Sequence, residues 1–242
     1  RAALARHRGR HVEAGGACAG EGRGGGLGDV EVDVAEHDAG AVLGEQAGGG
    51  RADAAGAAGD DDERTVELRR LYPRDALFRS TIDMERYRFG AGEYKYFARP
   101  YPKPIDELKH ALYPHLLPIA RRWWERLGRE APWPDDLDEW LAMCHEAGQR
   151  KSTAILLKYG AGDWNALHRD LYGDLVFPLQ VVIALNDPGV DHEGGEFLLV
   201  EQRPRAQSRG TSFTLPRGHG FVFTTRDRPV RSARGWSAAP VR

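Results

Sequence analysis

The sequence predicts an α+β protein in which amphipathic helices pack on an antiparallel β-sandwich or barrel. Three observations support this class. Apolar residues recur at helical spacing between residues 64 and 148, and short β-rich runs follow one another from Lys151 without helices between them. Hydrophobic residues make up 41% of the 242 residues, which is enough to build a substantial core.

Residues 1–63 form a Gly- and Ala-rich segment that we predict to be disordered. No aromatic residue precedes Tyr72, so little apolar surface is available to offset the conformational entropy of folding. The segment lacks the Pro, Ser and Lys that usually enrich a disordered tail, and it begins without Met. Because its main residue types share GC-rich codons, we hypothesise translation from a wrong frame or start, which sequencing the 5′ end of the transcript tests.

Residues 64–150 are predicted to form a helical region that packs on the core. In DDLDEWLAMCHEAG, Asp135 is the expected N-cap and Gly148 the expected stop. The apolar residues between them have the spacing i, i+3, i+4, i+7 and are Leu137, Trp140, Leu141 and Cys144. The run PIDELKHALYPHLLPIARRWWERLG shows similar spacing, but Pro114 and Pro118 are expected to break or kink it.

Residues 151–242 are predicted to form the β-rich core. The expected strands are TAILLKY, PLQVVIALN, GEFLLVE, TSFTL and HGFVFTT. Turn clusters such as GAGD, NDPG, DHEGG and PRG separate them. Strands in series without intervening helices favour antiparallel pairing over a parallel sheet.

Charge and cysteine content limit the classes of partner. Lys and Arg number 34 against 36 Asp and Glu, so the formal net charge of −2 provides no global field for nucleic acid or an anionic membrane. Cys18 and Cys144 form no CxxC pair and fit a reducing compartment. No run approaches the roughly 18 apolar residues that span a bilayer, and the start lacks the apolar region of a secretory signal. We therefore expect a cytoplasmic protein.

His168, Arg169 and Asp170 carry the most informative chemistry. In an extended segment, residues i and i+2 project from one face, so His168 and Asp170 can reach one small ion while Arg169 points away. One imidazole and one carboxylate are two thirds of the facial triad that holds Fe(II) with open positions for oxygen chemistry. The third ligand would be a distant His. An H-x-D sequence also occurs by chance in many proteins, so the motif alone is weak evidence.

Two other motifs point to chemistry that the rest of the sequence does not support. HRDL resembles the opening of the kinase catalytic loop, but Asp174 and Leu175 stand where the Asn is expected, and no phosphate loop or DFG accompanies it. The run from Gly194 to Phe197 is similar to the signature of cyclic-dinucleotide synthases, yet it has one acid where metal-dependent nucleotidyl chemistry needs two. A Gly pair before a strand more simply marks a turn or bulge.

The combination of motifs is more specific than H-x-D. YGAGDWNALHRD, LYGDLVFPLQVVIALNDPG, GGEFLLVEQRPRAQSR and PRGHGFVFTTRDRPV resemble the 2-oxoglutarate-dependent oxygenases related to prolyl 4-hydroxylase. RFGAGEYKYFARPYP and ALYPHLLPIARRWWERLG are similar to the same group. The resemblance covers about residues 71–242.

The resemblance implies a double-stranded β-helix, or jelly roll, with packed N-terminal helices. It implies Fe(II) bound by His168 and Asp170, 2-oxoglutarate as cosubstrate and ascorbate as a further cofactor. Tyr159 aligns with a Tyr that often contacts the distal carboxylate of the cosubstrate, although a core Tyr with a hydrogen-bonded hydroxyl fits equally well. Asn165 stands at the second Tyr position of the pattern, which is a departure from it.

The resemblance also implies that the jelly roll is incomplete at its C-terminal end. In similar proteins the segment corresponding to GWSAAPVR runs into the distal iron-binding His and then a basic residue that pairs with 2-oxoglutarate, and this chain stops at Arg242. His219 and His192 are the other candidates for the third ligand. We expect both to be surface or turn residues, because most lone histidines are not ligands.

The resulting functional prediction is an Fe(II)- and 2-oxoglutarate-dependent dioxygenase that hydroxylates a protein or a small molecule. Nucleic acid is disfavoured, because the arginines of EQRPRAQSRG fit a solvated, charge-balanced hairpin better than a binding patch. The alternative is a catalytically inactive jelly-roll binding protein or the product of a truncated gene.

Overall fold

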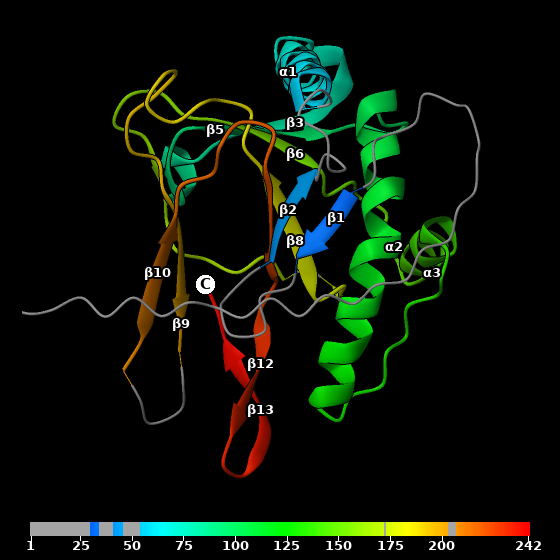
Figure 1. Cartoon of the computed structure of the whole chain (residues 1–242). Coiled ribbons are helices and arrows are strands. Elements are labelled where there is room, and N and C mark those ends of the chain that lie inside the picture. Colours follow the sequence, from blue (N-terminus) through cyan, green and yellow to red (C-terminus); the bar gives the residue numbers. More distant parts are fainter. Residues whose placement is uncertain (1–29, 34–40, 46–53, 172, 203–206) are drawn as a thin grey trace, which may run out of the picture.

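The computed structural model describes residues 30–33, 41–45, 54–171, 173–202 and 207–242. In these ranges the protein is mixed α/β, with antiparallel strands in several small sheets and no closed barrel (Figure 1). The predicted class of helices with antiparallel strands is confirmed at this level. The jelly roll that the resemblance implied is not confirmed.

The central sheet has helices on one face and a β-hairpin on the other (Figure 1). Its strands are antiparallel in the order β1 (Val30–Asp33), β2 (Ala41–Glu45), β11 (Gly220–Thr224) and β8 (Leu179–Ile183). Successive side chains of a strand point to opposite faces. Val222 therefore packs with the helices, whereas its neighbours Phe221 and Phe223 pack with the hairpin.

Two helices cover the first face of this sheet. They are α2 (Lys103–Arg126) and α3 (Leu137–Glu146), and they bury an aromatic and aliphatic cluster against Leu179 and Val222. Of the prediction that two prolines break or kink the first helix, the break is wrong, because α2 is continuous. Pro114 and Pro118 lie within α2 on its exposed side, where the carbonyls that lose their helical donors can bond to water.

The N-cap of α3 also differs from the prediction. Asp136, not Asp135, caps the helix, since its carboxylate accepts a hydrogen bond of 3.0 Å from the backbone N–H of Glu139. Asp135 instead forms an ion pair with Arg121 at 2.7 Å. Either of the two adjacent aspartates could cap the helix. The ion pair with Arg121 holds Asp135 away from this role, so Asp136 is the N-cap.

Two strands of a three-stranded sheet lie in a region predicted to be helical. The strands β3 (Phe78–Asp83), β5 (Glu93–Phe97) and β6 (Ile155–Lys158) pair antiparallel in that order, and α1 (Ala54–Leu71) packs on them through Leu71, Phe97 and Leu156. The side chains of β3 alternate between half-buried and exposed, as expected for a strand with one covered face. Short 3-10 turns at Asp75–Leu77 and Glu85–Tyr87 flank β3.

The hairpin on the second face consists of β9 (Phe197–Glu201) and β10 (Arg209–Phe213). It packs a phenylalanine-rich cluster against β11 and Val241. A second hairpin, β12 (Asp227–Ser232) and β13 (Gly235–Pro240), follows, and Val241 then pairs with Glu201 at the edge of β9. All five strands predicted from residue 151 onward are confirmed.

The predicted boundary at residue 63 falls inside α1. The strands β1 and β2 and the first part of α1 lie in the segment predicted to be disordered, whose other residues lie outside the described ranges. The three-part division of the chain stays a prediction. In the part of the chain that the structure describes, no helix has both the length and the apolar character needed to cross a membrane.

Candidate metal centre

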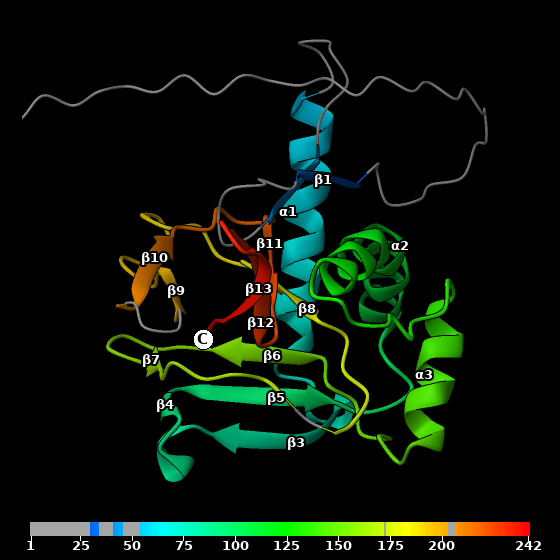
Figure 2. The ribbon, with the colours of Figure 1, turned by 90° about the horizontal axis from the view of Figure 1, so that it is seen from below.

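A short two-stranded ribbon positions the H-x-D segment. Its strands β4 (Gly90–Ala91) and β7 (Trp164–Asn165) pair antiparallel, and the backbone N–H of Ala166 donates a hydrogen bond of 2.7 Å to the carbonyl of Phe89. Figure 2 shows the ribbon at the end of the β3–β5–β6 sheet that lies away from α2 and α3. Backbone hydrogen bonds therefore fix the course of the chain just before His168.

Two glycines permit the close approach of these strands. Gly90 has φ of 140°, and a Cβ atom there would lie 2.1 Å from the carbonyl oxygen of Trp164. Gly92 has φ of 123°, and its Cβ would lie 2.8 Å from the ring of Tyr159. Both the backbone conformation and the space require glycine.

His168 and Asp170 lie together, as the i, i+2 spacing predicts. His168 Nε2 is 3.5 Å from Asp170 Oδ1, and both side chains are about half exposed, at 52% and 42%. His168 Nδ1 lies 2.7 Å from the carbonyl oxygen of Ala166. A proton on Nδ1 donated to this carbonyl leaves the lone pair of Nε2 available, which is how metal-binding histidines are commonly oriented. Contact with Asp170 raises the pKa of His168 above its ordinary value.

The pair supplies two donors of a metal site. Imidazole nitrogen and carboxylate oxygen are the donors that the facial triad of non-haem Fe(II) uses, so the two residues fit that ion. Within the described ranges, no group of three His, Cys, Asp or Glu side chains gathers closely enough to hold a metal. The third donor is therefore not found near the pair among these residues.

Tyr159 lies beside the same ribbon. Its hydroxyl accepts a hydrogen bond of 3.2 Å from the side-chain amide of Asn165, and its ring packs over Gly92. Burial of the phenol raises the pKa of Tyr159 above its ordinary value. Asn165, which departs from the hydroxylase pattern, thus orients the Tyr that the pattern retains. The side chain remains 44% exposed, so its hydroxyl can also be reached from solvent.

The other two candidate histidines lie in turns. His219 Nδ1 is 3.2 Å from the carbonyl oxygen of Arg217, and His192 Nδ1 is 3.1 Å from that of Gly194. Neither joins His168 and Asp170 in a metal-binding group among the described residues. Both are exposed, in agreement with the expectation of surface or turn residues.

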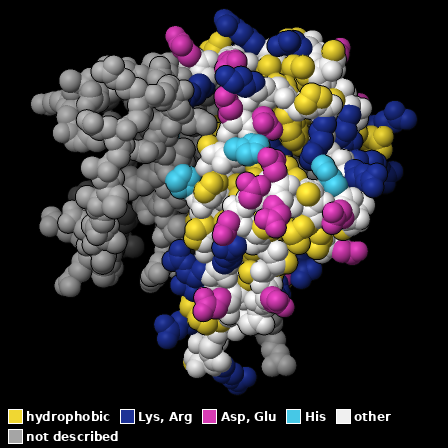
Figure 3. Space-filling view, turned by 90° about the vertical axis from the view of Figure 1, so that its right-hand side faces the viewer, with side chains coloured by type: hydrophobic (Ala, Val, Ile, Leu, Met, Phe, Trp, Pro, Cys, Tyr) yellow, Lys and Arg dark blue, Asp and Glu magenta, His cyan; other side chains and the backbone are white. Residues whose placement is uncertain are grey.

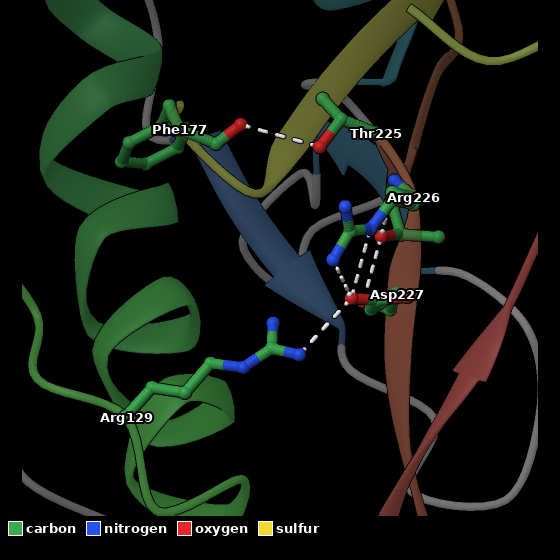
Figure 4. A network of polar contacts seen from close by, with 6 residues as sticks. Arg129, Phe177, Thr225, Arg226 and Asp227 are labelled. Atoms are coloured by element: carbon green, nitrogen blue, oxygen red, sulfur yellow. Dashed lines mark hydrogen bonds and ion pairs between the residues drawn. The ribbon is translucent and has the colours of Figure 1, made fainter. Parts of the chain in front are cut away.

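Sequence reasoning missed the residues that support the C-terminal hairpin. Arg129 and Arg226 both donate to Asp227 Oδ2, at 3.1 Å and 2.9 Å, and thereby connect the end of α2 to β12 (Figure 4). Arg228 holds the buried Glu201 of β9 through Nε, at 2.9 Å, and through a second guanidinium nitrogen. Arg226 and Asp227 are neighbours in sequence, but no local spacing rule could have indicated the pairing of Arg129 with Asp227 or of Arg228 with Glu201.

Arg169 was expected to point away from His168 and Asp170. It is half-buried, and its Nε atom is enclosed without a hydrogen-bond partner in the described part of the chain. A buried guanidinium nitrogen without an acceptor is uncommon and calls for an explanation. It places an unsatisfied donor within the H-x-D segment itself.

Comparison with known proteins connects this geometry to a family. The family Oxygenase-NA, described as "Oxygenase, catalysing oxidative methylation of damaged DNA", matches residues 92–242. Two uncharacterized proteins of Mycobacterium tuberculosis, from strains CDC 1551 / Oshkosh and ATCC 25618 / H37Rv, are each 73% identical over 146 residues. That alignment covers 60% of this chain and 63% of each relative, so the chain spans less than two thirds of their length. No solved structure matches.

The matched region contains Tyr159, His168 and Asp170. It agrees with the predicted oxygenase class but does not confirm the narrower resemblance to prolyl 4-hydroxylase. The family description names damaged DNA, whereas the sequence argument disfavoured nucleic acid. That argument relied on the net charge and on one arginine-rich hairpin, and it did not consider local surfaces around the ribbon.

Proposed function

This chain belongs to the Oxygenase-NA family of oxygenases, and we propose that it is an Fe(II)- and 2-oxoglutarate-dependent dioxygenase that acts on damaged DNA. The pairing of His168 Nε2 with Asp170 Oδ1 at 3.5 Å, on the half-exposed end of the ribbon, carries the proposal. An imidazole and a carboxylate in an oxygenase family suit Fe(II), because the facial triad leaves positions open for oxygen and cosubstrate.

His168 and Asp170 would hold the iron together with a histidine that is not part of their immediate group. When bound, the iron would use O2 to couple decarboxylation of 2-oxoglutarate to hydroxylation of a substrate C–H bond, with one oxygen atom going to succinate, the other to the substrate, and CO2 released. The chain's own residues orient the reactants. With its proton on Nδ1, His168 would donate a hydrogen bond to the carbonyl oxygen of Ala166, which directs Nε2 to the metal, while Asn165 holds the Tyr159 hydroxyl that would bind the distal carboxylate of 2-oxoglutarate.

Damaged DNA enters the proposal through the family description alone. The motifs that resemble those of prolyl 4-hydroxylase-like enzymes suggest a relationship to that group. A protein or a small molecule is therefore the alternative substrate to test against DNA. Because the formal net charge is −2, DNA binding would depend on local features rather than on the field of the whole protein.

The first experiment measures Fe(II) binding and the conversion of 2-oxoglutarate to succinate in the presence of ascorbate. It compares residues 1–242 with a version extended through the codons that follow in the gene. We expect His168→Ala and Asp170→Asn to abolish iron binding and turnover in whichever version is active. His192→Ala is the matched control, because that exposed side chain lies in a turn and does not join His168 and Asp170 among the described residues, and it should leave both unchanged.

Iron binding that is equal in the wild type, His168→Ala and Asp170→Asn would overturn the assigned ligands. Turnover by residues 1–242 alone would show that a histidine within them, such as His219, completes the site. DNA binding without iron binding or turnover in either version would instead favour a binding protein without oxygenase activity.

A further inference from the structure

Large apolar side chains remain exposed around the β4–β7 ribbon. The exposed fractions are 50% for Tyr87, 48% for Phe89, 59% for Trp164 and 47% for Leu167. Single exposed apolar residues are ordinary, but several on one small element indicate an interaction surface. They flank the H-x-D segment rather than the core of any sheet.

The register of the ribbon places two of these rings on one face. Ala91 pairs with Trp164, and the hydrogen bond from Ala166 to Phe89 extends the same register by one pair. Paired residues in an antiparallel ribbon share a face, and diagonal neighbours are within reach of aromatic side chains. Phe89 and Trp164 are therefore diagonal neighbours, each opposite a small alanine that leaves its ring uncovered.

The same face continues toward the proposed iron ligands. In an extended chain the residues at i, i+2 and i+4 share a face, so Trp164 and Ala166 are followed on that side by His168. The contact of His168 Nδ1 with the carbonyl oxygen of Ala166, at 2.7 Å, keeps the imidazole close to this run of backbone. The aromatic face and the metal donors are thus parts of one surface.

Cationic side chains accompany the rings. The Tyr87 and Phe89 rings stack with centroids 5.7 Å apart and planes inclined by 20°. Arg86 lies 5.9 Å from the Tyr87 ring, and Arg88, with φ of 58°, stands between the two aromatics in sequence. Both arginines are exposed. Alternating aromatic and cationic residues are the combination with which proteins hold single-stranded nucleic acid.

The helical face of the molecule has a different character. Figure 3 views the protein from the side of α2 and α3 and shows Asp and Glu side chains gathered near the centre of that face. Exposed acids there include Asp135, Asp136, Asp138 and Glu139. Asp135 pairs with Arg121, and acids and bases are interspersed on this face, so it offers no aromatic and cationic combination like that of the ribbon.

We propose that the surface formed by Tyr87, Phe89 and Trp164 stacks the bases of unpaired DNA, with Arg86 and Arg88 on its phosphates, and so presents a base to His168 and Asp170. The inference rests on the proposed function and names where its substrate binds. An enzyme that acts on a base must take that base out of the duplex or accept single-stranded substrate. Aromatic platforms beside the metal donors meet that requirement.

The test measures binding by fluorescence anisotropy, using the full chain at fixed salt. The probes are a labelled oligothymidylate and an abasic strand of equal length and charge. We expect wild type to bind the thymidylate at least about 5-fold more tightly, and Trp164→Ala or Phe89→Ala to weaken that binding about 5- to 100-fold each. Neither substitution should change binding of the abasic strand.

Trp236→Ala is the matched control. Trp236 is 41% exposed on β13, where its ring contacts Arg126 at 4.4 Å, so its loss should not weaken DNA binding. The double variant Arg86→Gln, Arg88→Gln should lower the slope of log affinity against log salt by about 1.4, since each phosphate contact on a single strand contributes about 0.7. Phe89→Ser replaces any alanine variant that does not fold.

Three results would overturn the proposal. The first is that wild type binds the abasic strand and the thymidylate with equal affinity. The second is that Trp236→Ala and Trp164→Ala weaken thymidylate binding equally. The third is that wild type binds no DNA at low salt. Fe(II) binding and 2-oxoglutarate turnover are also measured on the same samples without DNA. These measurements distinguish failure of the proposed DNA surface from failure of the proposed function. Stacking without turnover in either residues 1–242 or the extended version would refute the chemistry alone, and turnover without stacking would refute the DNA surface alone.

Discussion

The β4–β7 ribbon and the base of the β12–β13 hairpin differ in the burial and pairing of their charged side chains. At the hairpin base the side chains of Asp227 and Glu201 are only 7% and 5% exposed, and arginines form ion pairs with both carboxylates. On the ribbon, His168 and Asp170 are about half exposed and have mainly each other as partners. Apolar rings differ in a similar way, because those beneath the β9–β10 hairpin are buried and those on the ribbon are exposed.

This difference separates residues that hold the fold from residues that are available to a ligand. A buried carboxylate must have its charge compensated within the protein, because burial without a partner costs several kcal/mol. A half-exposed imidazole and carboxylate are solvated and keep lone pairs for another atom. Substitutions should therefore affect stability at the hairpin and ligand binding at the ribbon.

The largest expected effect is at Glu201. Glu201→Ala leaves the buried Arg228 guanidinium without its carboxylate and should lower the free energy of unfolding by about 3–5 kcal/mol, measured by urea denaturation. The double variant Glu201→Met, Arg228→Met removes both charges, so its free energy of unfolding should fall by less than that of Glu201→Ala. A double variant less stable than Glu201→Ala would contradict this account.

Asp227 should show a smaller, pH-dependent effect. Burial alone would raise the pKa of Asp227, but hydrogen bonds from Arg226 and Arg129 outweigh it and hold the pKa below its ordinary value. The stabilisation is then present above the unfolded carboxyl pKa of about 4 and is lost as pH falls through the folded pKa. Asp227→Asn should cost about 1–3 kcal/mol at neutral pH, because both arginines are partly exposed.

Urea denaturation from neutral to acidic pH checks the sign of the Asp227 effect. The wild type should lose stability toward acid, and Asp227→Asn should show a weaker dependence on pH. Equal dependence in the two proteins would remove Asp227 from the explanation.

Gly90 provides the corresponding test on the ribbon. Gly90→Ala combines an unfavourable φ of 140° with a Cβ placed 2.1 Å from the Trp164 carbonyl oxygen. We expect a loss of about 1–3 kcal/mol and faster amide exchange at Ala166. Gly162→Ala is the control, since Gly162 has φ of 85° but a Cβ added there would meet nothing within 4 Å. Equal exchange at Ala166 in both variants would show that strand approach does not matter.

The smallest effect on stability is expected at His168. His168→Ala removes a half-exposed side chain and should change the free energy of unfolding by no more than about 0.5 kcal/mol, even though it abolishes the iron binding proposed above. A loss above about 1.5 kcal/mol would instead assign His168 a structural role and blur the distinction between the two regions.

Sequence reasoning predicted five of the strands after residue 151, because they are short β-rich runs bounded by turn residues, but not β7, β12 or β13. It missed β3 and β5 because charged residues that are uncommon in strands interrupt their apolar runs, and one of these, Lys95, is buried. It expected prolines to interrupt α2, although both lie on the side where solvent satisfies the freed carbonyls. The local sequence pattern does not indicate which side of a helix or strand is covered by the rest of the fold.

For the site, the i, i+2 rule correctly brought His168 and Asp170 together, and their role as iron ligands stays a prediction. Tyr159 was placed by its pattern, but its bond to Asn165 was not foreseen, because Asn165 entered only as a departure from that pattern. The exposed rings of Phe89 and Trp164 meet through strand pairing between residues far apart in sequence. Such proximity follows from tertiary structure alone.

The peptide unit at Ala166 has an evolutionary consequence. Its N–H bonds to Phe89 and its carbonyl oxygen to His168, so the connection from the ribbon to the imidazole runs entirely through main-chain atoms. Most substitutions at position 166 would preserve that connection, whereas proline would remove the donor. Selection on the geometry of His168 would then leave little trace in the identity of residue 166. A comparison of homologous sequences would therefore overlook the position that links the ribbon to the imidazole.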